Sequence, residues 1–200
     1  LDRKPNKQPD RVREQSWTYD MYASLPEDGN RYEVLDGVLE LMSPGPSASH
    51  QTVNRELLFI LMQSCRSDYI LFSAPLDVIL SDTVVVQPDL VMIHRSREQI
   101  VTERAIEGAP DLVVEIVSPG SRKRDKVVKL TLYARHGVPE YWVIDPVSRT
   151  LEQYKPGEGG VYRLHNLFER DDTVVSDHVP CISFALRDLF ADMPSSRGEA

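Results

Sequence analysis

The sequence predicts a mixed α/β or α+β fold, in which a mixed β-sheet is flanked by helices and extra β-hairpins lie near both ends. Two observations support this class. Short apolar runs typical of strands lie between and after two longer segments with helical spacing. The chain has 200 residues, of which 41% are hydrophobic, and this is sufficient for one domain with a substantial core.

Two longer helices and one short helix are expected. Residues 50–65 place apolar side chains on one face, namely Val53, Leu57, Ile60 and Leu61. The second long helix covers about 122–136 and ends at Gly137, a residue type common at helix C-termini. The stretch WTYDMYASLP predicts a short helix that Thr18 caps.

Strands are expected in the segments around these helices. A hairpin with an Asp36-Gly37 turn is predicted in RYEVLDGVLELM, which would place Glu33 opposite Glu40. Three strands follow the first long helix, at about 69–80, 84–93 and 111–117. After the second long helix we expect the strand PEYWVID, a hairpin around PGEGG, and a last strand in CISFALRDLF that passes into a short helix.

Three parts of the chain are distinguished by composition. Residues 1–15 are polar and contain two prolines, so we expect a disordered arm there. Residues 16–192 are expected to form a single domain, and residues 193–200 a tail. No apolar run approaches the ~20 residues needed to span a bilayer, so we expect no membrane contact and a cytoplasmic location.

Charge and cysteine content limit the possible functions. The net charge is −8 and the pI is about 5.1, so the whole surface does not attract nucleic acid and any phosphate-binding patch must be local. Cys65 and Cys181 form no CxxC pattern, and we expect two buried free thiols. The sequence leaves the oligomeric state open, with a homodimer as one alternative.

Two carboxylates interrupt apolar strands and are the first candidates for chemistry. Asp89 follows Gln87-Pro88 inside the run VVVQPDLVMI, and Glu115 lies inside DLVVEIVSP. An ionised carboxylate that is buried without a partner costs several kcal/mol. A shared Mg²⁺ or Mn²⁺ would compensate both, because Mg²⁺ commonly takes one or two carboxylates and completes its shell with water and phosphate oxygens. The structural alternative is that Asp89 caps a turn and Glu115 pairs with an arginine.

A basic helix directly follows the Glu115 strand. Residues 121–135 contain six Lys or Arg and one acid, Asp125. The spacing of Asp125, Lys129 and Tyr133 places them on one side of a helix, where Lys129 could reach back towards Glu115. We expect the remaining basic side chains at the start of this helix to bind nucleic acid: Arg122, Lys123, Arg124 and Lys126. The alternative is a solvated helix face.

Taken together, these motifs resemble the Uma-two family of restriction-endonuclease-like proteins, which has the PD-(D/E)XK nuclease fold. The resemblance rests on QPD, VEIVSP and the following D…K…Y, and extends from YEVLDG to YWVIDP. It implies a restriction-endonuclease-like core, with Asp89 and Glu115 as metal ligands. The lysine of the wider superfamily would fall at Val117, and in the Uma-two pattern its role passes to Lys129.

Two further residues match the family pattern. Glu33 corresponds to the acid of the YE motif and would act as an auxiliary acid, with Lys129 or a metal relieving its repulsion from Glu40. The alternative is that both glutamates face solvent. His50 opens the first long helix and could orient water or phosphate; its alternative is simple exposure to solvent. Asp77 is a weaker candidate of the same kind.

The sequence therefore predicts a Mg²⁺- or Mn²⁺-dependent endonuclease that hydrolyses phosphodiester bonds of nucleic acid, with DNA the favoured substrate. Hydrolysis of a small phosphoester on the same carboxylates is one alternative. A non-catalytic nucleic-acid or protein-interaction module with the same fold is the rival hypothesis. It is supported by the acidic net charge and by Val117 in place of the strand lysine.

Overall fold

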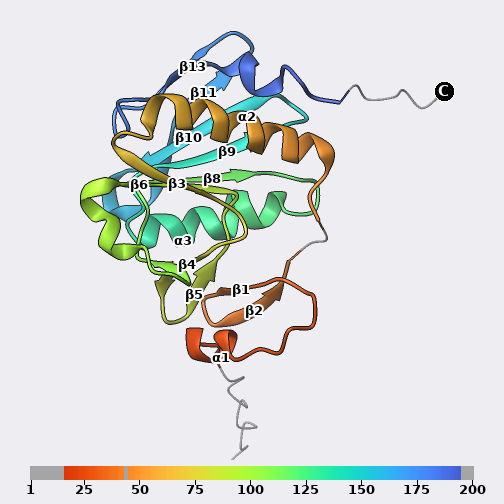
Figure 1. Cartoon of the computed structure of the whole chain (residues 1–200), viewed down its shortest axis with the longest axis vertical. Coiled ribbons are helices and arrows are strands. Elements are labelled where there is room, and N and C mark those ends of the chain that lie inside the picture. The colour runs from red at the N-terminus through yellow and green to blue at the C-terminus, as the bar shows by residue number, and fades with distance from the viewer. Residues whose placement is uncertain (1–15, 43–44, 195–200) are drawn as a thin grey trace, which may run out of the picture.

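The computed structural model describes residues 16–42 and 45–194. The predicted arm at 1–15 and residues 195–200 of the predicted tail lie outside this range. Within it, two large β-sheets and three helical segments form a mixed α+β fold, which confirms the predicted class (Figure 1).

The larger sheet has six strands in the order β11-β10-β9-β8-β6-β3. The central strands β8 and β9 run parallel, and every other neighbouring pair is antiparallel. In sheet order the strands are β11 (Tyr162–Glu169), β10 (Thr150–Pro156), β9 (Tyr141–Asp145), β8 (Leu112–Ile116), β6 (Leu90–His94) and β3 (Tyr69–Ser73).

The second sheet has five strands in the order β2-β1-β5-β4-β7. The β1–β2 hairpin has the predicted register, because Glu33 lies opposite Glu40 and Leu35 opposite Val38. In sheet order the strands are β2 (Val38–Leu41), β1 (Tyr32–Leu35), β5 (Val84–Val86), β4 (Asp77–Ser81) and β7 (Ala105–Glu107). A separate two-stranded sheet pairs β12 (Thr173–Val175) with β13 (Ser183–Ala185).

The helices lie close to their predicted positions. The short α1 (Tyr19–Ala23) begins after Thr18, whose side chain accepts a hydrogen bond from the Met21 backbone. Helix α2 (Ala48–Cys65) is capped by Ser47. The basic helix begins at residue 122 but contains a π-helical stretch, η2 (Arg124–Lys129), before it continues as α3 (Leu130–Arg135). Short 3₁₀ turns are η1 (Arg95–Ile100), η3 (Glu158–Gly160) and η4 (Leu186–Phe190).

Two of the expected strands are each divided between the two sheets. The segment predicted at 69–80 forms β3 and β4, and the segment predicted at 84–93 forms β5 and β6. Each division falls at a proline, Pro75 or Pro88, which cannot donate a hydrogen bond to a strand ladder. The polar residues inside VVVQPDLVMI therefore mark the crossing from one sheet to the other.

Hydrophobic clusters cover both faces of the six-stranded sheet. On one face, α2 and η4 pack against apolar side chains of β6, β8 and β9. On the other face, α3 lies between this sheet and the five-stranded sheet, as Figure 1 shows. The predicted face of α2 is correct, since Val53, Leu57 and Leu61 are fully buried and Ile60 is half-buried.

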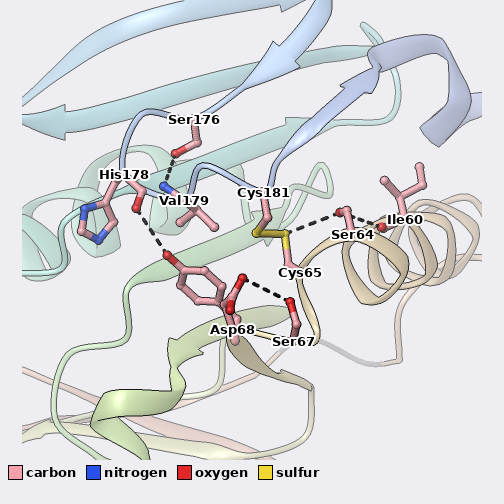
Figure 2. The surroundings of a disulfide bond; sticks show 10 residues. Ile60, Ser64, Cys65, Ser67, Asp68, Ser176, His178, Val179 and Cys181 are labelled. Carbon is pink, nitrogen blue, oxygen red and sulfur yellow. Dashed lines mark hydrogen bonds between the residues drawn. A yellow bond between two sulfur atoms is a disulfide. The ribbon is translucent and has the colours of Figure 1, made fainter.

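The expectation of two free thiols is wrong. Cys65 at the end of α2 and Cys181 before β13 form a disulfide, with their Cα atoms 5.3 Å apart (Figure 2). The two cysteines are separated by 116 positions, so only the packing of η4 and its neighbours against α2 brings them together. The spacing of the two cysteines in the sequence does not reveal this contact.

Among the described helices, none is both long enough and apolar enough to cross a membrane.

Candidate active site

Asp89 and Glu115 lie beside each other where two strands pair. Asp89 directly precedes β6, and Glu115 lies near the end of the neighbouring β8. The Ile116 backbone N–H donates a hydrogen bond of 2.7 Å to Asp89 Oδ2. Glu115 points with Val113 and Val117 towards α3, on the face that strict alternation predicts.

Lys129 lies between two buried carboxylates. Its Nζ is 2.8 Å from Glu115 Oε1 and 2.7 Å from Glu33 Oε1, and the residue is only 1% exposed. Tyr133, one turn further along, donates its hydroxyl to the same Glu115 oxygen at 2.8 Å. The helix thus directs Lys129 and Tyr133 at Glu115, as their spacing predicts.

Glu33 joins this cluster from the five-stranded sheet. It is fully buried, and its Oε1 accepts a second hydrogen bond from the Gln87 backbone N–H at 2.9 Å. Lys129, one of the two expected cations, therefore pairs with Glu33, while Glu40 on the opposite strand is half-buried. Glu33 Oε2 is buried without a hydrogen-bond partner among the described residues.

The cluster contains more buried carboxylates than lysines. Burial raises the pKa of Glu115 well above its ordinary value, and the attraction of Lys129 offsets only part of this. Burial likewise raises the pKa of Asp125, a cavity residue for which the sequence supplied only a helix position. Burial lowers the pKa of Lys129, but Glu115, Glu33 and Asp125 together raise it above its ordinary value, so the lysine is charged. A further cation would therefore be stabilised beside these buried carboxylates.

His50 contacts the same site from the first turn of α2. Its Nε2 is 3.1 Å from Asp89 Oδ2, and the residue is 9% exposed. The alternative of a solvent-exposed histidine is therefore wrong. Its Nδ1 has no hydrogen-bond partner in the part of the chain that the structure describes.

A cavity of about 230 Å³ opens onto these side chains, with Asp89, Glu115, His50 and Lys129 in its wall. No protein hydrogen bond reaches Asp89 Oδ1 or Glu115 Oε2 within the described ranges. Two carboxylate oxygens that are free of protein contacts fit Mg²⁺ or Mn²⁺, which prefer such ligands. Within residues 16–42 and 45–194 no group of three or more Asp, Glu, His or Cys could hold a metal, so water or substrate oxygens would complete the shell.

The four basic residues expected to bind nucleic acid occupy different environments. Arg122 donates to Asp145 at 2.7 Å, and Lys126 donates to Glu152 at the same distance. Lys123 is exposed, and Arg124 lines the cavity. The structure therefore divides a run that the sequence treats as one patch.

Comparison with known proteins gives the family and supports the fold. The family model Uma2, described as "Putative restriction endonuclease", matches residues 19–187. The chain belongs to the Uma2 family. A crystal structure described as a putative nuclease belonging to DUF820 from Anabaena variabilis is similar, with 24% identity and a TM-score of 0.71, over 87% of this chain and 97% of that chain. At this identity it supports the fold alone. No curated protein matches the chain.

The structure adds a network that the Uma2 resemblance did not specify. The Gln87 side chain donates to Tyr22 and Asp77, and accepts from Arg31. Because the Gln87 backbone also binds Glu33, this network fixes the crossing segment beside the site. The sequence could have indicated Gln87 as a site residue because it belongs to the QPD motif. Nothing local in the sequence connects Arg31 or Tyr22 with Gln87. Asp77, a weak candidate from sequence, therefore supports the site through its hydrogen bond with Gln87.

Proposed function

We propose that this Uma2 protein is a Mg²⁺- or Mn²⁺-dependent endonuclease that hydrolyses phosphodiester bonds of nucleic acid, with DNA as the expected substrate. The observation that carries the proposal is the placement of Lys129 against Glu115 and Glu33, in the wall of a cavity that also contains Asp89. Membership of a family whose model is described as "Putative restriction endonuclease" supports this reaction class.

Asp89 and Glu115 would hold the metal through their free oxygens. The bound ion would supply Lewis-acid stabilisation of the phosphate and lower the pKa of a bound water. His50 would fix the orientation of the Asp89 carboxylate through its contact with Oδ2. Glu33 would hold Lys129 in place from the opposite side.

Lys129 has the geometry to assist the attacking water. An ammonium group has three N–H donors, and Glu115 and Glu33 account for two of them. The third would bind the water or a phosphate oxygen and stabilise the negative charge that develops during attack. The attacking water releases a proton to solvent as its oxygen forms a bond to phosphorus, the P–O3′ bond breaks, and the leaving oxygen takes a proton from solvent. The products are a 5′-phosphate and a 3′-hydroxyl, by analogy with the superfamily.

A non-catalytic nucleic-acid or protein-interaction module is the second candidate. One observation favours it: Asp145 and Glu152 already pair with Arg122 and Lys126, which leaves little free positive charge near the cavity of a protein with net charge −8. Metal binding and cleavage separate the two functions.

Calorimetric titration of Mn²⁺ into wild type, Asp89→Ala and Glu115→Gln tests the metal site. We expect binding by wild type and its loss in Asp89→Ala. Because burial raises the pKa of Glu115, the carboxyl is protonated below that pKa and must release a proton to bind metal. Affinity should therefore rise with pH in wild type, and Glu115→Gln, which lacks the second metal ligand, should lose binding at every pH.

Cleavage of DNA and RNA panels with Mg²⁺ or Mn²⁺ then tests the reaction. We expect wild type to cut one of the panels and Asp89→Ala to be inactive. A protein that binds no divalent metal, or binds it without cleaving either panel, would support the interaction module instead.

A further inference from the structure

Arg124 differs from the other basic residues of its helix because its side chain lies inside the cavity. The side chain is 16% exposed, whereas that of Arg122 is 51% exposed. Arg122 and Lys126 each form a short ion pair with a carboxylate that Lys129 does not contact. Arg124 lines the same cavity as Asp89 and Glu115.

None of the described residues forms a hydrogen bond with the Arg124 guanidinium. Its nearest carboxylate oxygens are Glu33 Oε2 at 3.9 Å and Asp125 Oδ1 at 4.0 Å, both beyond hydrogen-bond distance. Its Nε is buried without a hydrogen-bond partner in the described part of the chain, and so is Glu33 Oε2. Because Nε is fully buried, an acceptor from outside the protein would meet the terminal guanidinium nitrogens, which form no hydrogen bond with a described residue.

Neighbouring contacts keep Arg124 and Glu33 apart. Glu33 Oε1 is already bound by Lys129 Nζ and the Gln87 backbone N–H, which fix the position of the carboxylate. Arg124 begins the π-helical stretch, whose backbone position is tied to the buried Asp125 and Lys129. The guanidinium therefore lies in the cavity wall, and no carboxylate oxygen of the described residues is within hydrogen-bond distance of it.

The chemistry of the missing partner is that of an oxyanion. A guanidinium presents five N–H donors in a planar fork that matches the oxygens of phosphate. We propose that Arg124 binds a non-bridging phosphate oxygen of the nucleic acid inside the cavity, and that Arg122 and Lys126 do not contact this phosphate. This inference rests on the proposed function, since that function brings a phosphodiester to the cavity.

Binding in the absence of metal tests the inference separately from catalysis. The probes are short labelled single-stranded DNA and RNA, titrated in EDTA and followed by fluorescence anisotropy. We expect Arg124→Gln to weaken binding by about tenfold or more, the scale of losing a charge-assisted hydrogen bond. Arg124→Lys should recover only part of the affinity, because lysine lacks the fork. The matched control Arg122→Gln should change affinity by less than about twofold.

A second measurement distinguishes loss of the phosphate contact from loss of the fold or of the metal site. Arg124→Gln should bind Mn²⁺ at least as tightly as wild type, because removal of a neighbouring cation favours a divalent ion. Its thermal unfolding should remain cooperative.

Unchanged oligonucleotide affinity in Arg124→Gln, an equal loss in Arg122→Gln, or the absence of oligonucleotide binding by wild type would overturn the inference. If wild type neither binds Mn²⁺ nor cleaves while the Arg124 effect is observed, the proposed function fails and the phosphate contact stands.

Discussion

At the scale of single residues, Lys129 has two separable contributions. Its single positive charge pairs with Glu33 and Glu115, two buried carboxylates that come from different sheets. It also lines the cavity, and its third N–H is not used by either carboxylate. Breaking a buried ion pair by removing one partner typically costs about 3–5 kcal/mol, because the other charge is left unpaired. Loss of Lys129 is therefore expected to affect both stability and rate.

The comparison of Lys129→Ala with Lys126→Ala measures the catalytic contribution. We expect Lys129→Ala to reduce single-turnover cleavage by roughly 10²-fold or more, the scale of removing one electrostatic stabiliser. Affinity for Mn²⁺ and for nucleic acid should change only a few-fold, because the charge acts mainly as attack proceeds. Lys126 pairs with Glu152 and not with Glu33 or Glu115, so Lys126→Ala should reduce the cleavage rate much less.

Both variants are assayed at a temperature where denaturation curves show that they are folded. Equal cleavage rates in the two variants would show that Lys129 has a structural role only.

At the scale of elements, local patterns in the sequence predicted the helices and the first hairpin. The Asp36-Gly37 turn fixes the register that places Glu33 opposite Glu40, and apolar spacing identifies the buried face of α2. The side of Glu115 also follows from alternation along β8. These features depend on neighbours a few residues apart.

Features that depend on distant contacts were missed. The division of 84–93 into β5 and β6 arises because each half pairs with a different sheet. The π-helical stretch Arg124–Lys129 has i→i+5 bonds, which ordinary helical spacing does not reveal and which are frequent at functional sites. Because Arg124 lies in this π-helical stretch, the sequence indicated that the residue is positively charged but not that it lines the cavity.

The disulfide gives an element-scale prediction. It ties the end of α2 to the segment before β13 across 116 positions, and in the chain-entropy model a loop of this length contributes about 4–5 kcal/mol. Reduction should therefore lower the free energy of unfolding by several kcal/mol in denaturant titrations. The double variant Cys65→Ala, Cys181→Ala should match reduced wild type and be insensitive to reductant. Two free thiols in the unreduced, unfolded wild type would contradict the bond.

At the scale of the whole molecule, an acidic protein must approach a polyanion through a small cationic area. The net charge of −8 opposes long-range attraction. Along the basic run, Arg122 and Lys126 are already paired with Asp145 and Glu152. Exposed Lys123 and the cavity-lining Arg124 remain available for phosphate contacts.

This distribution of charge predicts a shallow salt dependence. Each phosphate contact contributes about 0.7–0.9 to the slope of log affinity against log salt, so two contacts give a slope of roughly 1.4–1.8. Measured in EDTA by anisotropy, Lys123→Gln should reduce the slope by nearly one contact, whereas Lys126→Gln should leave it unchanged because Glu152 already neutralises that lysine. A slope equivalent to four or more contacts, or an equal reduction in Lys126→Gln, would mean that these ion pairs open on binding and that the whole run contacts the phosphate backbone.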